Sequence, residues 1–239
     1  MKNRILPVLA AVAVATLPGI AQADVISLSS SDLNKSFTVD YNGYTGSGTI
    51  DGLASQIVFT LTGTTATSYT LGYSLTNTSG APITNSRVSG FGFNTDPTIS
   101  GASSTGTYSV TALNSNVPNV GSVDVCFKGG GGTNSCAGGG GGGVSLGDSG
   151  SGTLTLSFAS PVTSLTLSDF FTRYQSISGA GSTTSAVGSG TISTSSSSSS
   201  SGGTPVPEPG MFGLFALGVG ALMLRRRRQS SPAPQLAAA

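Results

Sequence analysis

Hydrophobic and polar residues alternate along much of the chain between residues 24 and 178. A period of two puts successive side chains on opposite faces of a strand, and the apolar positions are rich in aromatic and β-branched residues. The positions expected to face one core are Phe37, Val39, Tyr41, Ile57, Phe59, Leu61, Tyr69, Leu71, Tyr73, Leu75, Val123, Val125, Phe127, Leu154, Leu156, Phe158, Leu165 and Leu167. Turn sequences such as NG at Asn42 separate these runs, and helical periodicity is absent. The pattern predicts an all-β body of about seven to ten short strands. We expect a β-sandwich, with a jelly-roll-like strand order as one option.

A short apolar segment of different character precedes this body. Residues 1–23 begin with the basic sequence MKNR, continue with an apolar core and end with small residues at Ala21 and Ala23. This order is typical of a secretory signal peptide cleaved before Asp24. The body is therefore expected to be exported.

The body is followed by a segment with few hydrophobic side chains. Residues 179–204 are rich in Ser and Gly and include seven consecutive serines from Ser195 to Ser201. Such a composition predicts a flexible linker. Whether the serines carry O-linked sugar or form a naked spacer stays open.

A second apolar run lies near the C-terminus. It extends from Met211 to Leu224 without a charge and would be about 21 Å long as a helix, short for a bilayer core of about 30 Å. Four arginines follow it: Arg225, Arg226, Arg227 and Arg228. Snorkelling arginines and local thinning allow such a helix to span the membrane. Because clustered arginines stay on the cytoplasmic side, the run is expected to be a single membrane helix with the body outside.

The residues before this helix have a conformation set by proline. Pro205, Pro207 and Pro209 alternate with Val206 and Glu208, and each residue before a proline is restricted to an extended backbone. A protease or transpeptidase binds its substrate extended. Glu208 is the only Glu in the chain. It marks a charged, extended site next to the membrane.

These three parts together resemble the PEP-CTERM sorting signal. The resemblance rests on Val206-Pro207-Glu208-Pro209, the apolar helix and the arginine cluster within residues 205–228. It implies recognition by exosortase, a membrane enzyme that processes near Pro-Glu-Pro, and delivery to the cell surface or extracellular matrix of a Gram-negative bacterium. The inner membrane would hold the intermediate. The tail, residues 229–239, departs from the family pattern, in which the chain stops soon after the arginines.

Charge and composition exclude several classes of function. Between residues 24 and 204 there are four Lys and Arg residues against eight Asp residues, a net charge of −4, so a nucleic-acid partner is not expected. The chain contains no His, which removes Ser-His-Asp and Cys-His catalysis and histidine zinc sites. No pair of Asp residues stands out for glycoside hydrolysis. We therefore expect no catalytic residue, no metal site and no cofactor.

Cys126 and Cys136 are the only cysteines, and they flank a run of glycines. In an oxidising exported compartment, such a pair predicts a disulfide that closes a surface loop. This loop, with GFGFNTDP at Gly90 before it and FFTRYQSI at Phe170 after it, resembles the cistern subgroup of sorted proteins. That resemblance implies no known biochemical activity.

Three hypotheses remain for the body. It is a structural or adhesive component of an exopolysaccharide matrix, or a carbohydrate-binding module that uses Tyr44, Tyr108 or Asp96 in loops, or an enzyme with a carboxylate pair. The sequence favours the first and disfavours the third.

Overall fold

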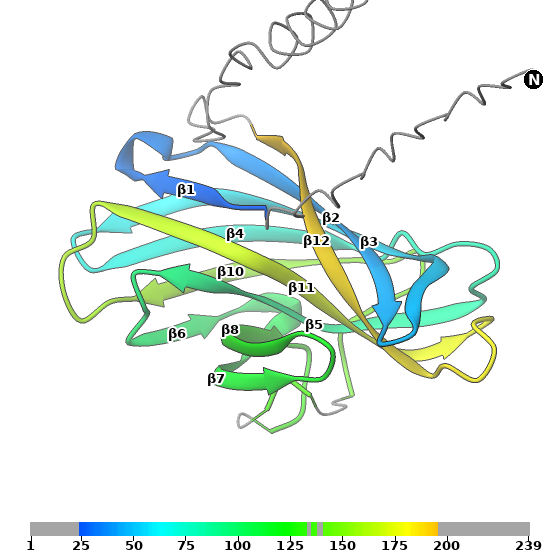
Figure 1. The fold of residues 1–239 in the computed structure, drawn as a ribbon. Coiled ribbons are helices and arrows are strands. Elements are labelled where there is room, and N and C mark those ends of the chain that lie inside the picture. Colours follow the sequence, from blue (N-terminus) through cyan, green and yellow to red (C-terminus); the bar gives the residue numbers. More distant parts are fainter. Residues whose placement is uncertain (1–23, 133–134, 138–140, 196–239) are drawn as a thin grey trace, which may run out of the picture.

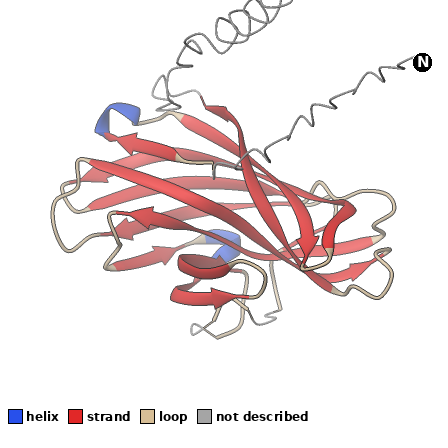
Figure 2. Cartoon of the chain, viewed as in Figure 1, coloured by secondary structure: helices blue, strands red, loops and turns tan. Residues whose placement is uncertain are grey.

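The computed structural model describes residues 24–132, 135–137 and 141–195. This part is 65% strand and 4% helical, and its helical residues lie in two short 3-10 turns (Figure 2). The strands are β1 (Ile26–Ser29), β2 (Ser36–Thr45), β3 (Gly48–Thr65), β4 (Ser68–Thr76), β5 (Asn85–Asp96), β6 (Gly101–Ser104), β7 (Val110–Val117), β8 (Gly121–Lys128), β9 (Val144–Ser145), β10 (Ser149–Ser157), β11 (Ser164–Ser178) and β12 (Ser185–Ser195). The 3-10 turns are η1 (Ser30–Asp32) and η2 (Gly106–Tyr108). The prediction of an all-β body is confirmed.

One antiparallel sheet carries all of these strands, where a sandwich of two sheets was predicted. Its order is β6-β10-β4-β3-β2-β12-β11-β5-β8-β7, with β1 added to β11 and β9 added to β5 (Figure 1). The two end strands come together, and the hydroxyls of Ser104 and Thr111 lie 3.2 Å apart between them. The sheet therefore curves around until it is nearly closed. Local alternation shows which side chains face inward, but it does not show which strands pair.

The core lies inside this curved sheet and is built from the predicted alternating positions. All eighteen side chains expected to face the core are buried, seventeen of them in this core and Val123 in a second, smaller cluster. Phe59 of β3 lies at its centre, with ring centroids 5.1 Å from Phe37, 5.9 Å from Phe91 and 6.1 Å from Phe170. These contacts join one half of the sheet to the other. Aromatic side chains thus fill the interior of the single curved sheet.

The strands are longer than expected. β3 has 18 residues and β11 has 15. The register of β3 against β4 shifts between Leu61 and Gly63, and that of β11 against β5 shifts between Ser168 and Phe171. Such bulges bend a strand and increase its twist, which lets long strands follow a curved sheet.

The sheet also continues into the segment predicted as a linker. β12 lies within residues 179–204 and pairs with both β11 and β2, so the boundary placed at residue 178 is wrong. Glycine has a packing role here. A Cβ on Gly190 would lie 2.7 Å from Phe170 Cβ, and one on Gly188 would lie 2.9 Å from Tyr174 Cε2. The Ser/Gly composition that suggested flexibility instead allows β12 to lie close against large core side chains.

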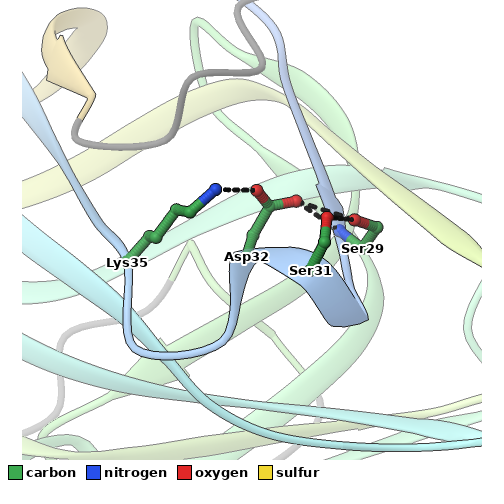
Figure 3. Close-up of polar contacts among 4 residues, drawn as sticks. All are labelled: Ser29, Ser31, Asp32 and Lys35. Atoms are coloured by element: carbon green, nitrogen blue, oxygen red, sulfur yellow. Dashed lines mark hydrogen bonds and ion pairs between the residues drawn. The ribbon is translucent and has the colours of Figure 1, made fainter.

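A buried carboxylate fixes the turn that joins β1 to β2. Asp32 is 1% exposed and accepts bonds from the Ser29 backbone N–H and hydroxyl, both at 2.9 Å, and from the Lys35 ammonium at 3.1 Å (Figure 3). Burial alone would raise the pKa of Asp32. The bonds from Ser29 and Lys35 outweigh this, so its pKa lies below the ordinary 3.8.

Replacing this carboxylate should destabilise the fold in a pH-dependent way. Asp32→Asn is expected to cost about 1.5–3 kcal/mol at neutral pH, since a buried charge-assisted network is lost. Because the folded pKa is depressed, the wild-type advantage is complete above the unfolded pKa and disappears as pH falls through the folded pKa. Urea unfolding at neutral and acidic pH measures this difference. The exposed Asp51→Asn serves as a control, and parallel acid profiles for wild type and Asp32→Asn would contradict the assignment.

Candidate functional site

The two cysteines form the predicted disulfide. Cys126 lies in β8, and its Cα is 6.2 Å from that of Cys136 in the glycine loop. The Cys136 N–H donates to Ser115 Oγ at 2.8 Å, which ties the loop to β7. The disulfide packs with Phe171 and Val187 in a small second core outside the sheet. The loop therefore covers the outer face at one end of the body.

This covering loop explains why two side chains of β8 are buried although the alternation predicted them on its polar face. Cys126 is 1% exposed and Lys128 is 5% exposed. The Lys128 ammonium donates to the carbonyls of Gly132 at 2.7 Å and Ser135 at 2.6 Å. Burial lowers the pKa of Lys128. The lysine thus stabilises the backbone of the loop from within.

Removal of the disulfide should cost stability without destroying the sheet. In the chain-entropy treatment a crosslink across ten residues contributes about 2–3 kcal/mol, so we expect a Cys126→Ser/Cys136→Ser variant to lose that amount in denaturant unfolding. A reducing agent should shift wild type by the same amount and leave the double variant unchanged. An identical midpoint for wild type with and without reductant would show that the crosslink contributes nothing.

A pocket of about 320 Å³ lies on the outer face of the sheet, beside the turn of the β7–β8 hairpin. Figure 1 shows this hairpin as a small lobe below β5. The lining residues that matter for its chemistry are Tyr44, Asn94, Val120, Asp169, Phe171 and Ser189. They come from β2, β5, the hairpin turn, β11 and β12. The pocket therefore exists only because distant segments meet on the folded sheet.

One wall of the pocket is tied to the hairpin. The hydroxyl of Tyr44 donates to the carbonyl of Asn119 in the turn at 2.7 Å. Burial raises the pKa of Tyr44. This bond holds the tyrosine ring against the pocket beside Val120.

One carboxylate, that of Asp169, also lines the pocket. Asp169 lies in the bulge of β11 and has φ of +51°, a left-handed backbone that is uncommon for a residue other than glycine. Its Oδ2 accepts from the Asn94 amide at 3.0 Å and from the Ser168 hydroxyl at 3.3 Å. In the described part of the chain the single ion pair is Asp32–Lys35, so no cation balances Asp169.

The three residues that the sequence suggested for sugar binding do not lie together in the structure. Tyr44 lines the pocket. Tyr108 is fully buried and its hydroxyl donates to the Val88 carbonyl at 2.8 Å, so its placement in a binding loop is wrong. Asp96 is exposed at the end of β5 and does not line the pocket. Asp169 was missed, although the break in alternation between Leu167 and Phe170 marks the bulge that positions it.

Over 24–132, 135–137 and 141–195, no group of three or more His, Cys, Asp or Glu side chains is placed to hold a metal ion. Within the same ranges no helix is long and apolar enough to cross a membrane.

The predicted signal peptide and sorting segment fall almost entirely outside those ranges. The cleavage residues Ala21 and Ala23 and the whole of residues 205–239 are not described. Asp24 is the first described residue, and its carboxylate accepts from the Ile192 N–H at 2.8 Å. The residue that would follow cleavage is thus bonded to β12, the strand that leads toward the C-terminal segment.

Comparison with protein families finds the PEP-CTERM protein-sorting motif at residues 205–228. The match spans the Pro-Glu-Pro sequence, the apolar run and the arginine cluster. Membership of the cistern subgroup is not confirmed. Comparisons with curated proteins and with solved structures give no match. The chain carries a PEP-CTERM sorting motif, and this motif implies export, passage through the membrane, processing by exosortase and sorting to the cell surface.

Proposed function

We propose that the protein is a structural or adhesive component of an exopolysaccharide matrix and has no catalytic role. The observation that carries the proposal is the sorting motif at residues 205–228, which implies delivery to the cell surface. The signal peptide at residues 1–23 would start export, and the helix from Met211 to Leu224 would pause the chain in the inner membrane. Exosortase would then release the body to the outside.

The outer face of the body supports contact with a neutral polymer. Across β2, β3, β4 and β10 the outward positions are mostly hydroxyls, which we call the hydroxyl face. Its members are Ser36, Thr38, Thr60, Thr70, Ser74, Thr76, Ser149, Ser151, Thr153 and Thr155.

The hydroxyl face is continuous and carries little charge. Neighbouring strands are joined by hydroxyl pairs, such as Ser36 with Thr60 at 2.7 Å and Thr76 with Ser149 at 2.8 Å. The sequences of these four strands contain no Lys or Arg. Hydroxyls both donate and accept hydrogen bonds, so such a face matches the hydroxyls of an uncharged polysaccharide.

Fractionation of the producing bacterium tests this proposal. We expect the wild-type protein to be recovered with the exopolysaccharide and to be released when that polysaccharide is digested. Ser74→Lys puts a charge in the middle of the hydroxyl face, between Val58 and Ser151, and should shift protein into the medium. Thr184→Lys makes the same change on the exposed turn before β12 and should not. Wild-type protein that stays with the cells after complete digestion would contradict the matrix role.

A second candidate function is that of a carbohydrate-binding module. It is favoured by the pocket, where Tyr44 and a carboxylate line a cavity of ligand size, since ligand pockets usually start at about 300 Å³. This function is compatible with a matrix role. The two differ in whether a defined site or a broad face makes the contact.

A further inference from the structure

We propose that the pocket beside the β7–β8 hairpin binds a neutral saccharide, with Asp169 accepting hydrogen bonds from sugar hydroxyls and Tyr44 and Val120 packing against the sugar ring. This inference rests on the second candidate function and assigns its site and ligand class.

The first argument is the orientation of Asp169. The bonds from Asn94 and Ser168 both fall on Oδ2. Among the described residues no donor bonds to Oδ1. The carboxylate is thus held in place by Oδ2, and because Asp169 is exposed and lines the pocket, Oδ1 is available to a ligand. Sugar hydroxyls are matching donors, because the remaining carboxylate oxygen has lone pairs that accept hydrogen bonds.

The second argument is the network behind Asp169. The side-chain Oδ1 of Asn94 accepts from the Asp124 backbone N–H at 2.9 Å, so the Asn94 side-chain NH2 group is turned toward Asp169. Asp124 in turn accepts from the Thr95 N–H at 2.8 Å. These bonds orient the binding group before a ligand arrives, which lowers the entropy lost on binding.

The third argument is the backbone of Asp169 itself. A positive φ at a residue other than glycine costs energy, and such residues cluster at binding and catalytic sites. Glycine would relieve the strain. The strain becomes understandable if the carboxylate is needed where the bulge places it.

The lining selects the class of saccharide. The half-buried Tyr44 and Val120 provide apolar surface for the C–H groups of a sugar ring, while Asn94 and Ser189 add polar groups. No Lys or Arg lines the pocket. An unbalanced carboxylate repels an anionic sugar, so neutral sugars should bind and uronic acids should not.

Calorimetric titration of the purified exported protein tests the assignment. The probes are neutral oligosaccharides of glucose, galactose, mannose and N-acetylglucosamine, with oligoglucuronate and oligogalacturonate as charged counterparts. At least one neutral probe should bind, and the uronates should bind at least about tenfold more weakly, a difference of about 1.4 kcal/mol. Asp169→Gly and Asp169→Asn should each weaken the neutral probe by at least about tenfold. Asp51→Asn, which changes an exposed carboxylate outside the pocket, should have no effect.

Stability separates loss of the ligand group from loss of the fold. Asp169→Gly should unfold at the same denaturant concentration as wild type or a higher one, because the glycine adopts positive φ without strain. Equal binding by wild type and Asp169→Asn, or preference for uronates, would overturn the inference. So would the failure of every probe to bind. If the protein still fractionates with the matrix in that case, the matrix role stands and only the pocket assignment fails.

Discussion

Glu208→Ala should leave the protein as a full-length precursor in the inner membrane and reduce the amount at the surface. Glu208 is the one charged residue between the prolines of the sorting motif at residues 205–228. A hydrogen bond to a charged group contributes about 1.5–3 kcal/mol, so processing should slow by about tenfold to a hundredfold. The apolar run and the four arginines stay intact, and insertion should be unaffected. Membrane fractionation and immunoblotting of the bacterium measure both pools.

A change beyond the arginines is the matched control. Ser230→Ala lies in the tail and should be processed like wild type. Glu208→Asp keeps the charge and should recover part of the surface pool. If Glu208→Ala reached the surface with the wild-type C-terminus, the segment would act as an ordinary anchor and not as a sorting signal.

Phe59→Ala should remove a large part of the stability of the body. Phe59 is fully buried and packs against rings from both halves of the sheet. Loss of a buried phenylalanine costs about 3–5 kcal/mol, and a domain has about 5–15 kcal/mol in total. Val58 is the neighbouring residue of β3 and lies on the outer face, so Val58→Ala should cost less than about 1 kcal/mol.

Denaturant unfolding of the exported protein compares the two variants. The expected result is a large loss for Phe59→Ala and a small one for Val58→Ala. Equal losses would contradict the fold, in which one face of β3 packs in the core and the other faces outward.

Local patterns predicted the inward face of each strand because that face depends on alternation alone. Phe59, Tyr73 and Leu156 are buried as their positions indicated. The same reasoning missed β12, since its glycines are required by contact with Phe170 and Tyr174, and those contacts are not visible in the segment itself.

The pocket shows the same limit for function. Tyr44, Asp169 and Ser189 lie in three different strands, and the sheet order that joins them could not be derived from turn lengths or periodicity. Burial of Lys128 likewise depends on a glycine loop that folds back over β8. The sorting motif is the opposite case. Its proline, charge and apolar features are contiguous, so residues 205–228 could be interpreted before any fold was known.

The central claim is that the chain is a processed substrate of the sorting machinery. Intact-mass analysis of the protein recovered from the cell surface tests it most directly. The account predicts a chain that begins at Asp24, ends near Val206–Pro209 and lacks Met211–Arg228. A surface protein that retains Arg225–Arg228 would contradict it.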